Sequence, residues 1–183
     1  MEYEIIRSKR KTMAAEIKQG KLLIRAPMGA TDSEIEALVQ KNRRWIETHL
    51  EKTRAQKAAA DALPKLTADD LRALAEQARR VIPERVAYYA PLVGVTYGRI
   101  TIRNQRTKWG SCSSRGNLNF NCLLMLAPPE VLDSVVVHEL CHRKEMNHSD
   151  RFYAEVERVF PDYAKWNRWL RENGSVLMLR LPK

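Results

Sequence analysis

The chain has 183 residues, which is enough for one well-buried domain or for a catalytic domain with a small appendage. Its 44% hydrophobic and 30% charged content is typical of a globular protein, and three cysteines without a C-x-x-C pair argue against a disulfide framework or a zinc ribbon. The formal charge of +10 predicts attraction to anions, including nucleic acid. The charged start and the lack of a long apolar run predict a cytoplasmic protein without a membrane span.

The first 60 residues are expected to form a small unit of strands and a helix. Alternating residues predict short strands at 3–7, 12–18 and 21–26, the last two joined by a hairpin turn at Gln19–Gly20. A capping box at Ser33 to Glu36 predicts a helix that continues to about residue 58. A hinge at residues 58–64 then separates two predicted domains, 1–60 and 65–183.

The second predicted domain mixes helices with a small sheet. Thr67 begins a helix that continues toward Tyr89, with a kink or break expected at Pro83. The remaining expected elements are strands at 99–103 and 117–121, a helix from Glu130, a helix from Pro161 and a terminal strand at 176–181. The predicted fold class is therefore α+β.

A His-Glu-x-x-His motif lies in the helix expected from Glu130. His138 and His142 are four residues apart, so they share one face of the helix and can share one metal ion. Glu139 is placed to take a proton from a water molecule that the metal activates. The motif predicts one Zn²⁺ ion, although another divalent transition metal would suit the same ligands.

His148 supplies a third candidate ligand. It lies six residues after His142, too far to continue the same face of one unbroken helix, so the chain must turn between them. Asn147 is the expected pivot, because asparagine tolerates the left-handed conformation that ends helices. Ser149 can then cap a new helix, which leaves His148 free to return to the metal.

Residues 85–129 carry six basic side chains and no Asp or Glu. Such a segment before the metal helix predicts positive potential near the site or, equally, a solvated basic face. The six residues are Arg85, Arg99, Arg103, Arg106, Lys108 and Arg115.

Several motifs together resemble the YgjP-like family of metal-dependent hydrolases, over nearly the whole chain. They are Arg106 to Cys112, Leu118 to Asn121, Pro128, the His138 to His142 helix, Asn147 to Ser149 with Phe152, Pro161 to Tyr163, and the front unit with Lys41 to Ile46. This family is similar to the SprT-like proteases and to zincin peptidases in general. The chain lacks the cysteine-rich zinc ribbon of many SprT-like proteins, which weakens any inference of DNA-linked proteolysis.

The resemblance implies a zincin-like catalytic domain in residues 65–183. His138, His142 and His148 would be the zinc ligands, and Glu139 the catalytic base. It also implies that a strand near residues 117–121 forms an edge for an extended peptide, which makes Asn119 and Asn121 candidate substrate-binding residues.

Three functions follow as hypotheses. The first is a zinc metallopeptidase acting on a peptide or protein, with Tyr153, Tyr163 or Arg143 as the oxyanion donor. The second is a nucleotide phosphoanhydride hydrolase, in which the basic segment 99–115 binds the phosphates through Arg103, Arg106 and Lys108. The third and weakest is a nucleic-acid-binding module with a structural zinc, which leaves Glu139 unexplained.

Overall fold

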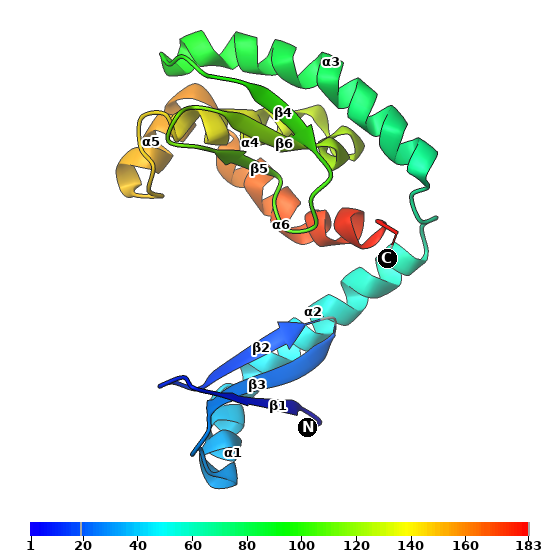
Figure 1. Cartoon of the computed structure of the whole chain (residues 1–183), viewed down its shortest axis with the longest axis vertical. Helices are drawn as coiled ribbons and strands as arrows, with labels where there is room; N and C mark the ends of the chain where they lie inside the picture. Colours follow the sequence, from blue (N-terminus) through cyan, green and yellow to red (C-terminus); the bar gives the residue numbers. More distant parts are fainter. Residues whose placement is uncertain (19, 183) are drawn as a thin grey trace. The chain divides into compact units, whose positions relative to one another are not determined.

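The chain folds into two compact units, which divide between Leu63 and Pro64 in the computed structural model (Figure 1). The structure describes residues 1–18 and 20–182. Each unit combines helices with a three-stranded sheet, so the predicted α+β class is confirmed. Within the described residues, none of the helices has both the length and the apolar character needed to cross a membrane.

A mixed sheet forms the centre of the amino-terminal unit. Its strands are β1 (Glu4–Ser8), β2 (Ala14–Lys18) and β3 (Lys21–Pro27), in the order β1-β3-β2. Strand β3 is parallel to β1 and antiparallel to β2, and its residues Leu22, Ile24 and Ala26 are buried against the helices. All three strands were predicted to within two residues, but the predicted turn includes Gln19, which lies outside the described residues.

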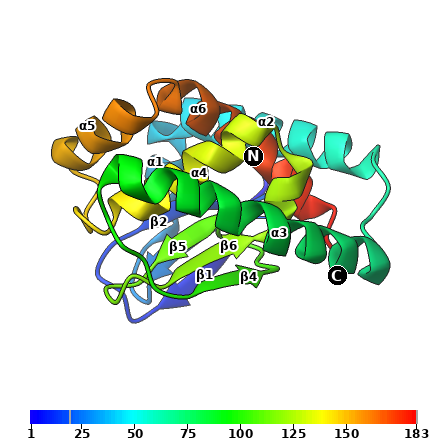
Figure 2. The ribbon, with the colours of Figure 1, turned by 90° about the horizontal axis from the view of Figure 1, so that it is seen from above.

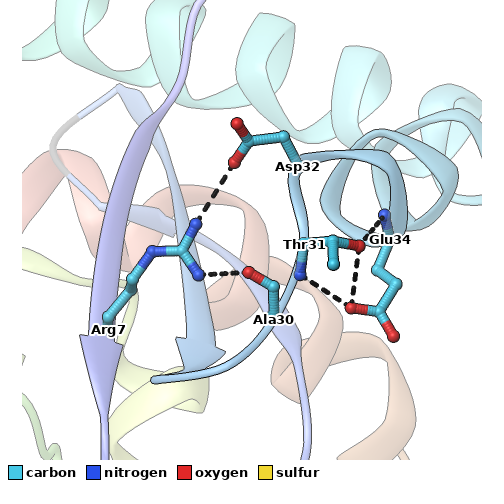
Figure 3. A network of polar contacts seen from close by, with 5 residues as sticks. All are labelled: Arg7, Ala30, Thr31, Asp32 and Glu34. Atoms are coloured by element: carbon cyan, nitrogen blue, oxygen red, sulfur yellow. Dashed lines mark hydrogen bonds and ion pairs between the residues drawn. The ribbon is translucent and has the colours of Figure 1, made fainter.

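Two helices, not one, follow this sheet: α1 (Asp32–Lys41) and α2 (Arg43–Asp61). They separate at Asn42, whose side-chain amide donates to the carbonyl of Leu38 at 2.8 Å and so competes with the helix backbone. The predicted cap at Ser33 was also wrong. Thr31 accepts from the backbone of Glu34 at 3.3 Å, and the Glu34 carboxylate accepts from the Thr31 backbone at 2.7 Å (Figure 3).

Arg7 fixes the entry to α1 from the opposite side of the same turn (Figure 3). Its guanidinium donates to the carbonyl oxygen of Ala30 and forms an ion pair with Asp32 at 3.2 Å. Strand β1 is thereby connected to the first turn of the helix, where an acidic side chain also complements the helix dipole.

The second unit begins with α3 (Ala68–Val93), which is capped by Thr67 as predicted and ends at Gly94 in the left-handed conformation (φ 77°). Of the kink or break predicted at Pro83, the break does not occur, because the helix continues through this residue. Burial explains this result: Ile82 and Val86 are fully buried on either side of the proline, and this packing holds the helical path.

The sheet of the second unit has the order β4-β6-β5, with β6 between its two neighbours (Figure 2). Its strands are β4 (Ile100–Arg103), β5 (Gly110–Cys112) and β6 (Leu118–Asn121). Strand β6 is parallel to β4 and antiparallel to β5. Residues 117–121 therefore do not form an edge, contrary to prediction, and β5 and β4 are the two edges.

The chain continues through a 3-10 turn, η1 (Cys122–Leu126), into α4 (Pro129–Cys141), α5 (Asp150–Val159) and α6 (Tyr163–Leu179). Helix α4 is buried on nearly all sides, as its apolar sequence indicates. The terminal strand predicted at 176–181 is wrong. Helix α6 extends to Leu179, because Leu177 is buried on the helix and Leu181 after it packs with Leu66 and Leu123.

An ion pair fixes the start of α4 to α3. The guanidinium of Arg85 donates two hydrogen bonds of 2.7 Å to the carboxylate of Asp133, and the Tyr89 hydroxyl donates to the same group at 3.1 Å. Asp133 is buried, so these three donors replace the water it loses on folding. This arrangement holds the helix that carries the site.

Candidate functional site

Three histidines meet where α4 ends and α5 begins. His138 lies on α4, His142 caps its carboxyl end, and His148 directly precedes Ser149, the N-cap of α5. One ring nitrogen of each histidine lies within 4.8 Å of the others, and the Nε2 atoms of His138 and His148 are 3.1 Å apart. The turn between the helices therefore brings together the residues that the motif singled out.

Hydrogen bonds at Nδ1 orient two of these rings. Nδ1 of His142 donates to the carbonyl oxygen of Glu145 at 3.1 Å, and since a carbonyl only accepts, Nε2 of the neutral ring carries the lone pair. Nδ1 of His138 lies 2.8 Å from the hydroxyl oxygen of Tyr163, the arrangement that fixes a metal-binding histidine. Zinc bound tetrahedrally at about 2.0–2.1 Å separates two ligand nitrogens by about 3.3 Å, so the cluster fits the ion.

Burial keeps the imidazoles of His138 and His142 neutral, the form that ligates metals. It lowers the pKa of His138 to about 3, with further contributions from His142 and His148. Burial also lowers the pKa of His142. The same cause raises the pKa of Tyr163, so its hydroxyl remains protonated beside His138.

Phe152 forms the floor of the histidine cluster. Its ring is fully buried, stacks on His142 with centroids 4.6 Å apart, and meets His138 and His148 edge-on at 4.9 Å. It lies on the first turn of α5, four residues after His148. One aromatic ring therefore restricts all three imidazoles to their observed orientations.

Glu139 lies against strand β5, and the close contact between its side chain and this strand depends on a glycine. A Cβ at Gly110 would be 2.5 Å from the Oε1 atom of Glu139, so any side chain there would force Glu139 to move. Glu139 is 5% exposed. Burial raises its pKa to about 8, against the opposing effect of Lys108, and a bound cation would lower it.

A pocket of about 210 Å³ opens beside His138 and Glu139. Lys108 and Trp109 line one side, and Asn167 on α6 lines another. Trp109 is held in place by contact with α6, since a Cβ at Gly174 would lie 3.0 Å from its ring. A larger pocket of about 960 Å³ lies in the amino-terminal unit and contains none of the three histidines, so size alone does not identify the site.

The two asparagines expected to bind substrate have structural contacts instead. Asn121 is 1% exposed, and its amide donates to the carbonyls of Gln105 at 2.7 Å and Lys108 at 3.0 Å. Asn119 donates to the hydroxyl of Ser111 at 3.3 Å across the β5–β6 pair. Because β6 is the central strand, these side chains stabilise the sheet and the 105–108 loop, and the substrate-binding assignment is corrected.

The basic residues assigned to substrate binding do not converge. Lys108 lines the pocket at Glu139, as the sequence suggested. Arg106 instead donates to the carbonyl oxygen of Pro182, and Arg103 lines a separate groove between β4 and α3. Strand β4 is the opposite edge of the sheet from β5, and the groove that Arg103 lines contains none of the three histidines.

Two of the three expected oxyanion donors are fixed in place by hydrogen bonds. Arg143 donates to the carbonyls of Thr96 and Ser114, both at 3.1 Å, and so holds two loops. The Tyr163 hydroxyl oxygen accepts from Nδ1 of His138 when that ring ligates a metal through Nε2, so its position is fixed while its own proton remains available. Tyr153 is 38% exposed, and its ring centroid lies 6.2 Å from that of His148. Its hydroxyl forms no hydrogen bond within the described residues, and Tyr153 is the exposed member of the three expected donors.

Two residues of this site were not assigned from the sequence. Phe152 was recognised as an apolar helix position and as part of a family motif but was given no role, although its spacing of four from His148 places it one turn beyond a candidate ligand. Gly110 was part of a motif without a physical explanation. The signal was the glycine itself, which often marks a close approach of backbone to another group.

The chain is similar to two solved structures and to one protein family. Two solved structures are similar to half of the chain: the metallopeptidase zymogen abylysin of Pyrococcus abyssi and the metallopeptidase zymogen jannalysin of Methanocaldococcus jannaschii. Abylysin has 23% sequence identity and a TM-score of 0.45, and the match covers 50% of this chain and 93% of abylysin. Jannalysin has 22% identity and a TM-score of 0.44, and the match covers 49% of this chain and 93% of jannalysin. A search of curated proteins finds no match. The YgjP-like metallopeptidase domain matches residues 11–70 and 62–173, which confirms the resemblance, and the chain therefore belongs to the YgjP-like family of metallopeptidases.

Proposed function

We propose that this protein is a zinc-dependent peptidase in which His138, His142 and His148 hold the ion. One observation carries the proposal: three imidazole nitrogens within 4.8 Å of one another, next to the buried carboxylate of Glu139. The three-nitrogen set is typical of catalytic zinc, which keeps a further position for water or substrate. We also propose that residues 65–183 form the catalytic domain and residues 1–60 a separate domain.

Glu139 acts as the general base in this proposal. When bound, Zn²⁺ supplies Lewis acidity, which lowers the pKa of water to about 7 and polarises a carbonyl group. Glu139 accepts the proton from that water and then donates it to the leaving amine of the cleaved peptide bond. Tyr163 and Phe152 hold the imidazoles in place, and the Tyr153 hydroxyl donates a hydrogen bond to the developing oxyanion.

The substrate adds to the edge of the sheet at β5. The backbone N–H of Asn121 donates to the carbonyl oxygen of Trp109, and the backbone N–H of Ser113 donates to the carbonyl oxygen of Asn117. Residues of β5 that bond to β6 therefore alternate with residues that do not. The N–H and C=O of Gly110 therefore point away from β6, toward the open edge. An extended peptide bonded there would pass directly over Glu139.

Activity and metal content test the proposal together. We expect Glu139→Gln to retain stoichiometric zinc but to lower kcat/KM on an unfolded protein substrate by about 10²- to 10⁴-fold.

Two further variants test the other assigned roles. His138→Ala should lose the metal, and Tyr153→Phe should keep the metal and lower kcat by about 10²-fold. Glu130→Gln, on the exposed start of the same helix, is the matched control. Unchanged hydrolysis in Glu139→Gln would refute the assignment.

The nucleotide hydrolase alternative has lost its main support, because Arg103 and Arg106 lie away from the histidines. A panel of nucleoside triphosphates, assayed beside unfolded polypeptides, distinguishes the nucleotide hydrolase hypothesis from the peptidase hypothesis. Turnover of triphosphates alone, abolished in Glu139→Gln, would contradict the peptidase proposal.

A further inference from the structure

Strand β4 has an open edge that faces away from the active site. It pairs with β6 on one side, with Ile100 opposite Leu118 and Ile102 opposite Phe120. Leu118 donates to the carbonyl of Arg99 at 2.9 Å, so the backbone groups of residues 99, 101 and 103 point toward β6. In a parallel ladder the N–H and C=O groups of Ile100 and Ile102 then point outward.

Strand β4 lies beside α3 (Figure 1), and residues of both line a groove. The groove has a volume of about 470 Å³ and is lined by Arg79 and Pro83 of α3 and by residues 99–103. Proline has no N–H, so the carbonyl oxygen of Arg79 lacks its usual helical donor at position 83. The groove thus places the outward backbone groups of β4 opposite a helix turn in which one hydrogen bond is missing.

Three arginines surround these groups. Arg79, Arg99 and Arg103 are exposed, and no acidic residue in the described part of the chain forms an ion pair with them. Arg99 and Arg103 share one face of β4, while Ile100 and Ile102 on the other face pack against the core. The charge is therefore concentrated beside the outward backbone groups and free to bind an anion.

We propose that this groove binds an extended, acidic polypeptide segment as an additional strand along β4. Outward N–H and C=O groups at every second residue match the backbone of a polypeptide, whereas a phosphodiester chain offers no N–H donors. The arginines match carboxylate side chains. Since β4 and β5 are opposite edges of the sheet, the segment can be held while β5 remains open. The site would thus capture acidic stretches of a protein at a distance from Glu139.

A synthetic peptide tests this site without requiring catalysis. The probe is a fluorescein-labelled peptide of alternating glutamate and valine, and binding to the full-length Glu139→Gln protein is measured by fluorescence anisotropy. We expect saturable binding that weakens by about tenfold or more in Arg99→Glu/Arg103→Glu, because two attractive charges become repulsive. Arg115→Glu is the matched control, since this exposed arginine of the same segment does not line the groove.

A second probe separates strand addition from simple charge attraction. The same peptide with N-methyl groups on alternate residues keeps its carboxylates but cannot pair along a strand edge, so we expect it not to bind. Equal binding of the methylated peptide would overturn the proposal. Equal competition by an oligothymidylate of the same charge, or equal loss of affinity in Arg115→Glu, would overturn it too, in favour of general polyanion binding. Circular dichroism of each variant excludes loss of fold as the cause.

Discussion

Gly110 is the residue whose replacement tests the geometry of the site most directly. A Cβ there would lie 2.5 Å from Oε1 and 2.8 Å from Cδ of Glu139, and the backbone itself is not in the left-handed region. The Glu139 side chain would have to move while the strand stays. We expect Gly110→Ala to keep its fold and its zinc but to lower kcat/KM by about 10²-fold, as displaced catalytic groups do.

Gly29→Ala is the control for Gly110→Ala, because the space beside Gly29 is open. Metal content, circular dichroism and kcat/KM should all match the unsubstituted protein in this control. Full activity of Gly110→Ala would mean that the carboxylate does not need its observed position. Loss of zinc would mean that the glycine supports the histidines rather than Glu139.

Single residues of the site were predictable where local spacing decides geometry. The pair His138 and His142 follows from the helix repeat, and the cap at Ser149 follows from its residue type. The contacts of Asn121 and Arg143 could not be read in this way. Both side chains bond to carbonyls of distant loops, and those partners are set by tertiary packing.

At the scale of elements, the errors come from interactions between segments distant in sequence. Strand β5 was missed, because Gly110 to Cys112 is short and has little strand propensity before it pairs with β6. The alternating residues 176–181 favour a strand locally, but Leu177 is buried on helix α6 and Leu181 is buried directly after it. Helix α3 likewise passes Pro83, because burial on both sides outweighs the lost hydrogen bond.

Helix α5 carries an ion pair whose contribution depends on pH. Arg158 and then Lys144 donate to Glu155 and lower its pKa from 4.5 to about 2. The folded protein therefore gains stability above pH 4.5, and loses it as the pH falls from 4.5 toward 2. We expect Glu155→Gln to lower the free energy of unfolding by about 1 kcal/mol at pH 7, a value kept small because solvent screens the half-exposed Arg158.

Urea unfolding of the zinc-free protein at a series of pH values measures this contribution. The difference between Glu155→Gln and the unsubstituted protein should shrink steadily between pH 4.5 and the lowest pH at which the protein stays folded. Glu157→Gln, an exposed position on the same helix, should show no such trend. A difference that is constant with pH would show that Glu155 acts through packing and not through its charge.

On the scale of the whole molecule, the composition does not determine where the charge lies. The net charge of +10 and the acid-free segment left two interpretations open, positive potential near the metal site and a solvated basic face. The sheet order instead separates the segment, with Lys108 at the pocket and Arg99 and Arg103 at the far edge. Strand order depends on long-range pairing, which a charge pattern along the chain does not encode.

The two units have separate buried cores, so a metal bound to one should stabilise that one. Zinc that binds only the folded state adds about 2.7 kcal/mol at a free concentration one hundred times Kd. We expect a chelator to lower the Tm of the unit that begins at Pro64 by about 10 °C and to leave the other transition unchanged.

Tryptophan fluorescence can follow the two transitions separately. Trp45 is the single tryptophan of the first unit, so the fluorescence of Trp45→Phe reports only on unfolding of the second unit. His138→Ala should show the lowered Tm without chelator. Equal shifts of both transitions, or none, would contradict a zinc site confined to the histidines.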